Sequence, residues 1–187
     1  MLRRYHSRVR VPTLAPSTPA AAIFKGMGPV KAIAPMLLAT AFAPASMHAL
    51  ERSRGLWATV DVCNPKDQPN TIGIRGSMPG DRHSRDTMYM RFRVQYQDPS
   101  SHRWIDVARG ADSGLVKVGS AAVTRQDGQS FRFAAAGQAF RLRGYVTFQW
   151  RRGSSVLGTI SKPTDAGHHS LAGADPKNYS AATCRIS

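Results

Sequence analysis

The chain has 187 residues, with 26 Lys and Arg against 11 Asp and Glu, and its formal net charge is +15 at pH 7. It has a single Glu, Glu51, and it contains no G-x-S-x-G elbow, H-E-x-x-H helix, P-loop or dinucleotide fingerprint. The missing motifs argue against the enzyme classes that these signatures define, and the scarcity of Glu disfavours a site built on paired carboxylates.

An uncharged apolar run extends from Ala32 to Ala45, directly after Lys31, and closes on the small residues Ala43-Pro44-Ala45. Its 14 residues fall short of the roughly 18 to 20 that a membrane-spanning helix requires. A basic flank, a short apolar run and small residues at its end are typical of a secretory signal. We therefore expect an exported, extracellular protein that is cut after Ala45, or after Ala49 as second choice, with no stable membrane span in the mature form.

The residues before this run form a long basic extension without any acid. Met27 could be the true start of a compact signal, and the alternative is a retained disordered arm. On either reading residues 1–45 lie outside the fold, 46–54 form a linker, and 55–187 form one domain. Residues 51–187 keep 20 of the basic and all 11 acidic residues, so this segment has a net charge of +9.

Two long stretches alternate apolar and polar residues, which is the pattern of a half-buried antiparallel strand. In 88–96 every second residue from Met88 is apolar, and in 140–150 the same holds from Phe140. Gly144 interrupts the second apolar row, and there we expect a bulge or a close contact with a neighbouring segment.

Shorter strands are predicted between turn-forming residues. They are residues 56–63, 71–75, 103–109, 115–119, 129–134, 154–160 and 181–186. Many short alternating strands joined by turns predict an all-β fold, an antiparallel two-sheet sandwich of immunoglobulin-like type rather than a closed barrel. About 140 residues suffice for one such domain without a structural metal.

The two cysteines, Cys63 and Cys184, allow one intramolecular pairing in an oxidising compartment. We expect a structural disulfide between the first and last strands. Trp57, Trp104 and Trp150 are expected as core or rim aromatics, and the alternative is a platform on which sugars stack.

The segments RGLWATVDVCN, GIRGSMPG, RLRGYVTFQWRRG and PKNYSAATCRI extend over most of residues 55–187. They resemble secreted proteins of GC-rich Gram-positive bacteria that are uncharacterised in function, in which a signal peptide precedes an immunoglobulin-like domain with two cysteines. The resemblance implies the fold, the export and the disulfide. It implies no activity.

Outward-facing arginines are one candidate for a binding site. Alternation places Arg91, Arg93, Arg132, Arg141 and Arg143 on outward positions, and these would form a basic stripe if their strands are neighbours. Such a stripe suits acidic wall polymers, anionic lipid head groups or nucleic acid. Nucleic acid is the weakest of the three, because few aromatic residues are interleaved with the arginines.

A long polar loop, residues 76–86, is the other candidate, since loops at the ends of sandwiches often carry binding residues. Its candidate residues are Ser77, Asp81, Arg82, His83 and Arg85. His168 and His169, with His83 and His102 elsewhere in the chain, could in principle assemble a metal site. Neighbouring side chains in extended backbone diverge, however, so that two adjacent histidines ligate one ion only in a special turn, and no metal or other cofactor is expected.

These observations predict a secreted, non-enzymatic binding module whose ligand is an anionic cell-surface polymer or an exported protein. The alternative is a small secreted enzyme or enzyme inhibitor whose site is built from loops.

Overall fold

The computed structural model describes residues 45–134, 137–168 and 171–187. The expected signal, with Met27, Lys31 and the apolar run up to Pro44, lies outside the described residues, as does His169. Within these ranges a short helix, α1 (Ala45–Glu51), precedes nine strands. The strands are β1 (Trp57–Cys63), β2 (Thr71–Met78), β3 (His83–Gln97), β4 (Trp104–Asp106), β5 (Val116–Ala121), β6 (Arg125–Arg132), β7 (Phe140–Arg152), β8 (Ser155–Pro163) and β9 (Cys184–Ile186).

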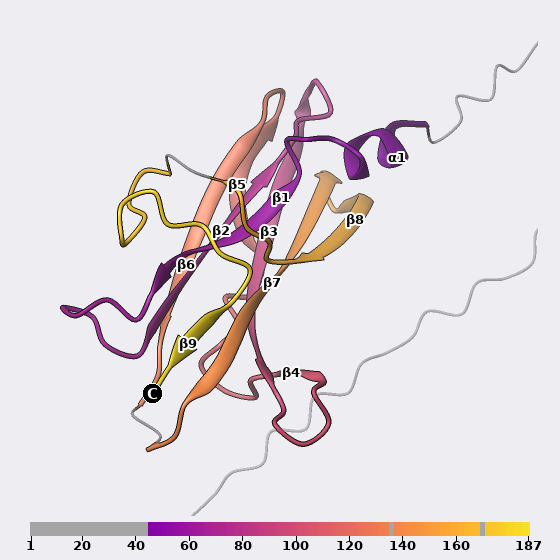
Figure 1. The fold of residues 1–187 in the computed structure, drawn as a ribbon. Helices are drawn as coiled ribbons and strands as arrows, with labels where there is room; N and C mark the ends of the chain where they lie inside the picture. Colours follow the sequence, from indigo (N-terminus) through magenta and orange to yellow (C-terminus); the bar gives the residue numbers. More distant parts are fainter. Residues whose placement is uncertain (1–44, 135–136, 169–170) are drawn as a thin grey trace, which may run out of the picture. The chain divides into compact units, whose positions relative to one another are not determined.

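The strands form two antiparallel sheets that pack as a sandwich (Figure 1). The smaller sheet has the order β1-β2-β6, and the larger has the order β4-β3-β7-β8, with β5 also paired to β3 and β9 to β7. All nine predicted strands are present, and the two-sheet antiparallel sandwich is confirmed. The finer immunoglobulin-like assignment stays a prediction.

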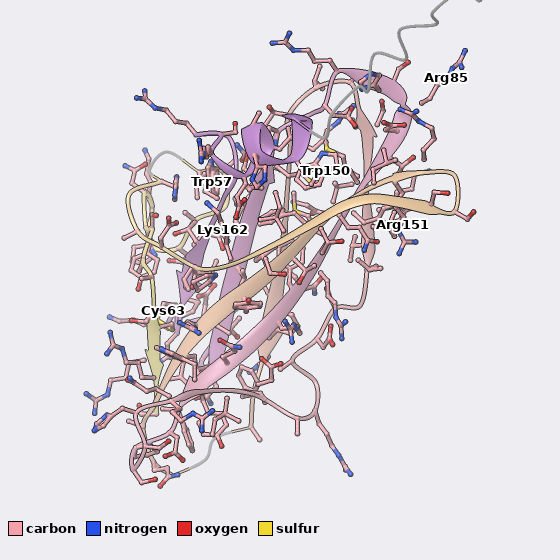
Figure 2. The ribbon with its side chains drawn as sticks, turned by 90° about the vertical axis from the view of Figure 1, so that its right-hand side faces the viewer. Trp57, Cys63, Arg85, Trp150, Arg151 and Lys162 are labelled. Atoms are coloured by element: carbon pink, nitrogen blue, oxygen red, sulfur yellow. A yellow bond between two sulfur atoms is a disulfide. The ribbon has the colours of Figure 1, made fainter. Side chains whose placement is uncertain are left out.

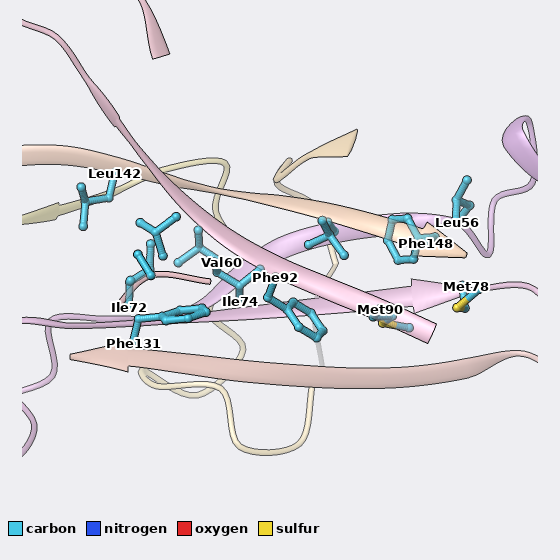
Figure 3. Close-up of a cluster of buried hydrophobic side chains, with 14 of the residues drawn as sticks. Leu56, Val60, Ile72, Ile74, Met78, Met90, Phe92, Phe131, Leu142 and Phe148 are labelled. Atoms are coloured by element: carbon cyan, nitrogen blue, oxygen red, sulfur yellow. The ribbon is translucent and has the colours of Figure 1, made fainter. Parts of the chain in front are cut away.

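The core lies between the two sheets, as Figure 3 shows. The smaller sheet contributes Val60, Ile72 and Ile74, and the larger contributes Phe92 and Phe148, all with no exposed surface. The predicted alternation holds along both long strands: β3 has alternately buried residues from Asp86 to Val94, and β7 from Leu142 to Trp150. The alternation of apolar and polar residues therefore correctly predicted which face of each long strand is buried.

Gly144 lies in β7 opposite Val94 of β3, without a register shift at this point. A Cβ added there would come within 2.7 Å of both Ile74 Cγ2 and Thr164 Cγ2. We expected either a bulge or a close contact at Gly144, and the structure shows the close contact. The side chains of Ile74 and Thr164 occupy the space in which a side chain at position 144 would lie.

The expected disulfide joins Cys63, at the end of β1, to Cys184, at the start of β9. These strands belong to different sheets, so the bond links the two layers and closes a loop with a sequence separation of 121 residues. This confirms that the bridge connects the first and last strands.

The expected linker 46–54 contains most of helix α1. Met47 and Leu50, three residues apart and hence on one side of the helix, pack against the hydrophobic core. The side chain of Met47 fills the space beside Gly158 of β8. Residues after Ala45 therefore contribute to the domain rather than only leading to it. Among the described residues, no helix has the length and apolar character needed to cross a membrane.

Candidate functional site

The outward arginines of β3 and β7 lie on one sheet face, because these two strands are direct neighbours. Arg93 is opposite Tyr145, and Gln95 is opposite Arg143, in a register without shifts. The predicted basic stripe depended on these strands being neighbours. This condition is met for the strands that carry Arg91, Arg93, Arg141 and Arg143. Figure 2 shows this face with Arg151 of β7, whose inward neighbour Trp150 is fully buried.

Arg132 does not belong to this stripe. It lies in β6, opposite Thr71 of β2, and hence in the other sheet. The alternation of residues showed correctly that Arg132 is exposed. It could not show to which sheet β6 belongs, and in a sandwich the two outer faces point in opposite directions.

Arg91 and Arg93 are paired with acids on the same face. Arg91 donates hydrogen bonds to both carboxylate oxygens of Asp112, at 2.8 Å and 3.1 Å from Nε. This contact raises the pKa of Arg91 and lowers that of Asp112. Arg93 donates to Asp106 at 2.5 Å. Two of the predicted anion-binding arginines are therefore neutralised within the fold.

Arg141 and Arg143 have neutral partners instead. The Arg143 guanidinium donates to Gln95 Oε1 at 2.8 Å and lies over the ring of Trp104, 4.4 Å from its centroid. Burial lowers the pKa of Arg143, although the guanidinium remains charged at pH 7. Arg141 is exposed and donates to Thr183 at 3.3 Å and to Gln97 at 3.5 Å.

Arg185 is a further arginine on this sheet face, and the sequence patterns did not predict it. It is exposed on β9 and lies directly opposite Arg141 of β7. Residues paired in antiparallel strands point to the same face. We call Arg141, Arg143 and Arg185 the basic cluster. Within the described ranges of the chain, none of the three forms an ion pair with an acidic side chain.

Aromatic rings are interleaved with the arginines on this face. Arg93 lies over Tyr145 at 5.0 Å, and Arg151 lies over Tyr89 at 5.0 Å. Together with Arg143 over Trp104 they form three cation–π pairs, each of which holds a long side chain flat against the sheet. Arg93, Arg143 and Arg151 are therefore each held in place on this face by an aromatic ring.

The second candidate, the predicted loop 76–86, is shorter than expected. Strand β2 continues to Met78, and β3 begins at His83. Ser77 is buried in β2 between Trp57 of β1 and Gln126 of β6. Ser77 is thus not a loop residue, because both neighbouring strands pair with it.

Asp81 and His83 lie beside a buried carboxylate, Asp86, which the sequence patterns did not single out. Asp86 is 1% exposed and accepts hydrogen bonds from Arg152 at 2.6 Å and 2.8 Å. The hydrogen bond from Arg152 lowers the pKa of Asp86. Burial raises the pKa of Asp81, and its contact with Asp86 adds to this effect. Arg82 and Arg85 are exposed, and Arg85 extends away from the fold (Figure 2).

Asp81, His83 and Asp86 are the described residues that could together hold a metal ion, since one ligand atom from each lies within 4.8 Å of the others. Arg152, however, already binds both carboxylate oxygens of Asp86. A metal ion would have to displace this guanidinium from Asp86. We therefore interpret Asp81, His83, Asp86 and Arg152 as an ion-pair network rather than a metal site.

The remaining aromatic and histidine candidates have structural roles. Trp150 is fully buried and donates from Nε1 to the carbonyl of Pro79 at 3.1 Å. Trp57 stacks on His168 with ring centroids 4.3 Å apart, and His168 also contacts Asp165 at 3.0 Å. One face of the Trp57 ring is therefore covered by His168, and one face of the Trp104 ring by Arg143. His102 has a positive φ in the turn before β4.

No protein-family model matches this chain, and no curated protein matches it either.

Proposed function

We propose that this protein is a secreted, non-enzymatic β-sandwich module that binds an anionic polymer of the cell surface. The polymer lies along the outer face of β7 and β9 and contacts the basic cluster. A disulfide between the sheets supports export, because such bonds persist in oxidising compartments.

One observation carries the proposal. Three arginines stand on two neighbouring strands, and within the described residues no carboxylate is paired with any of them. On the same sheet, Arg91 and Arg93 each have an aspartate. A guanidinium that is held by neutral hydrogen bonds and by an aromatic ring keeps its charge available to an external anion.

The ligand is extended rather than compact. Arg141 and Arg143 are two residues apart on one strand, and Arg185 is on the strand beside them, so the charges are spread over a flat surface. A flat sheet face suits a linear polymer with repeated negative charges, whereas a small anion needs donors that converge on one point.

The second candidate is a loop-built site at Asp81, His83 and Asp86, as a small secreted enzyme or enzyme inhibitor would have. Two carboxyl groups and a histidine within 4.8 Å favour it. Both oxygens of Asp86 are bound by Arg152, which makes this carboxylate a poor proton acceptor.

A comparison of two charge-matched variants tests the proposal. The full chain is bound to immobilised poly(glycerol phosphate), with uncharged dextran as the control polymer. Arg141→Gln/Arg143→Gln/Arg185→Gln should lose binding, and Arg82→Gln/Arg85→Gln/Arg125→Gln should retain it. All proteins carry the same basic N-terminal residues, so the difference reports the sheet face. Equal losses in both variants would show that only net charge matters, and a loss in the second alone would favour the loop.

A further inference from the structure

An apolar cavity lies at the end of the sandwich where β9 pairs with β7. It has a volume of about 270 Å³. Its wall is made of side chains from β3, β7 and β9 of the larger sheet and from residues that flank strands, such as Asn70 before β2 and Phe133 after β6. The lining residues are Asn70, Tyr96, Val107, Phe133, Ala134, Gln138, Phe140, Leu142, Ile186 and Ser187.

The cavity forms because the core is not closed at this end. Leu142 and Ile186 are buried core residues, but Tyr96, Phe133 and Phe140 pack against the core while remaining partly exposed. The rings of Tyr96 and Phe140 meet edge to face with centroids 6.4 Å apart. These aromatic groups stand around a space instead of filling it.

The lining defines the charge of the ligand. None of the ten lining residues has a charged side chain, and the polar side chains among them, those of Asn70, Tyr96, Gln138 and Ser187, are uncharged amides and hydroxyls. A charged molecule entering this space would lose hydration without gaining a side-chain partner of opposite charge. Arg141 does not change this, because it points to the outer face while its neighbours Phe140 and Leu142 point inward.

The volume defines the size of the ligand. An apolar cavity of roughly 150 Å³ holds benzene, and pockets for drug-sized molecules begin at roughly 300 Å³. The cavity falls between these values, so it suits a molecule of about two fused rings or an aliphatic chain of similar bulk.

We propose that the end cavity lined by Tyr96, Phe133, Phe140, Leu142 and Ile186 is a binding site for a small, neutral, mostly apolar molecule. This cavity is separate from the basic cluster. The inference that it binds a ligand does not depend on polymer binding.

Binding of 2-naphthol to the full, disulfide-bonded chain tests this inference, with 2-naphthoate as a charged probe of the same ring size. Methyl resonances of Val107, Leu142 and Ile186 report occupancy by NMR. We expect saturable shifts at these three residues with 2-naphthol, and binding of 2-naphthoate that is weaker by at least about tenfold.

Two variants reduce the cavity from different sides, Val107→Phe and Ala134→Trp, and either should weaken 2-naphthol binding by about tenfold or more. Val123→Phe is the matched control, because Val123 is 55% exposed and does not line the cavity. Unchanged affinity in folded Val107→Phe and Ala134→Trp proteins would overturn the inference. So would equal affinity for the two probes, no binding of 2-naphthol, or sedimentation showing that a second copy of the chain covers these methyl groups.

Discussion

Arg141 and Arg185 lie directly opposite one another in the antiparallel pair of β7 and β9. Like charges in such cross-strand positions destabilise a sheet. The next pair in this ladder joins Leu142 to Cys184, and Cys184 is bonded to Cys63 of the other sheet. The disulfide thus holds together a short strand pair that places two arginines side by side, and an external anion would relieve their repulsion.

Replacing Arg185 should therefore increase stability while it weakens polymer binding. We expect Arg185→Gln to raise the free energy of unfolding by about 0.2–1 kcal/mol at low ionic strength, and by less at high salt. Urea denaturation at two salt concentrations measures this. Arg125→Gln, on β6, is the control and should show no such gain. A loss of stability in Arg185→Gln at low salt would show that the two arginines do not repel one another.

Loss of the disulfide should affect both stability and the binding face. The Cys63→Ser/Cys184→Ser variant is expected to lower the free energy of unfolding by about 2–5 kcal/mol, in the range of native bridges. Since β9 has three residues, polymer binding should fall as well. Denaturation of the wild-type chain with and without reductant gives an independent value. If the reduced, folded chain still bound the polymer fully, the binding face would not depend on the disulfide.

A side chain at position 144 should be poorly tolerated. Gly144→Ala is expected to cost about 1–3 kcal/mol through overpacking against Ile74 and Thr164. Gly55→Ala is the matched control, because a Cβ there meets Ser53 Oγ at an ordinary 3.4 Å. Thermal and urea unfolding of both variants decide the point. Equal, small effects would mean that the two sheets can move apart at β7.

The Asp86–Arg152 pair should give a stability that depends on pH. Arg152 lowers the folded-state pKa of Asp86 below its ordinary value of 3.8, so this contribution is present above the unfolded pKa and is lost as pH falls through the folded pKa. Asp81, whose pKa is raised, acts in the opposite direction.

At pH 7 we expect Arg152→Gln to lower the free energy of unfolding, because it leaves Asp86, a carboxylate that is 1% exposed, without its guanidinium partner. The difference from wild type should shrink as the pH falls below the ordinary Asp value, where Asp86 becomes protonated in the variant. Urea midpoints at several pH values test this. A difference that is the same at pH 7 and pH 3 would show that the ion pair is not its cause.

Local sequence patterns predicted the strands well, because burial on one face imposes a period of two. The alternation from Met88 and from Phe140 gave the correct buried rows, and the cysteine count left one possible bridge. Strand ends were less certain: β2 extends to Met78 where the prediction ended at 75, since the residues Gly76 and Ser77 carry no apolar signal.

The site depends on pairing between distant segments, which alternation does not encode. The carboxylates that neutralise Arg91 and Arg93 come from residues 21 and 13 positions later, Asp112 and Asp106. Arg185 joins Arg141 only through the pairing of β9 with β7, and Arg132 leaves the stripe only because β6 pairs with β2. No periodicity within one strand reveals such neighbours.

The salt dependence of polymer binding tests the central claim most directly. The affinity of the full chain for poly(glycerol phosphate) is measured over a range of salt concentrations, for the wild type and for Arg141→Gln/Arg143→Gln/Arg185→Gln. If three phosphate contacts are lost, the slope of log affinity against log salt should become less negative by about 2, by analogy with single-stranded polyanions. An unchanged slope in a folded variant would contradict the account and place the binding elsewhere on the chain.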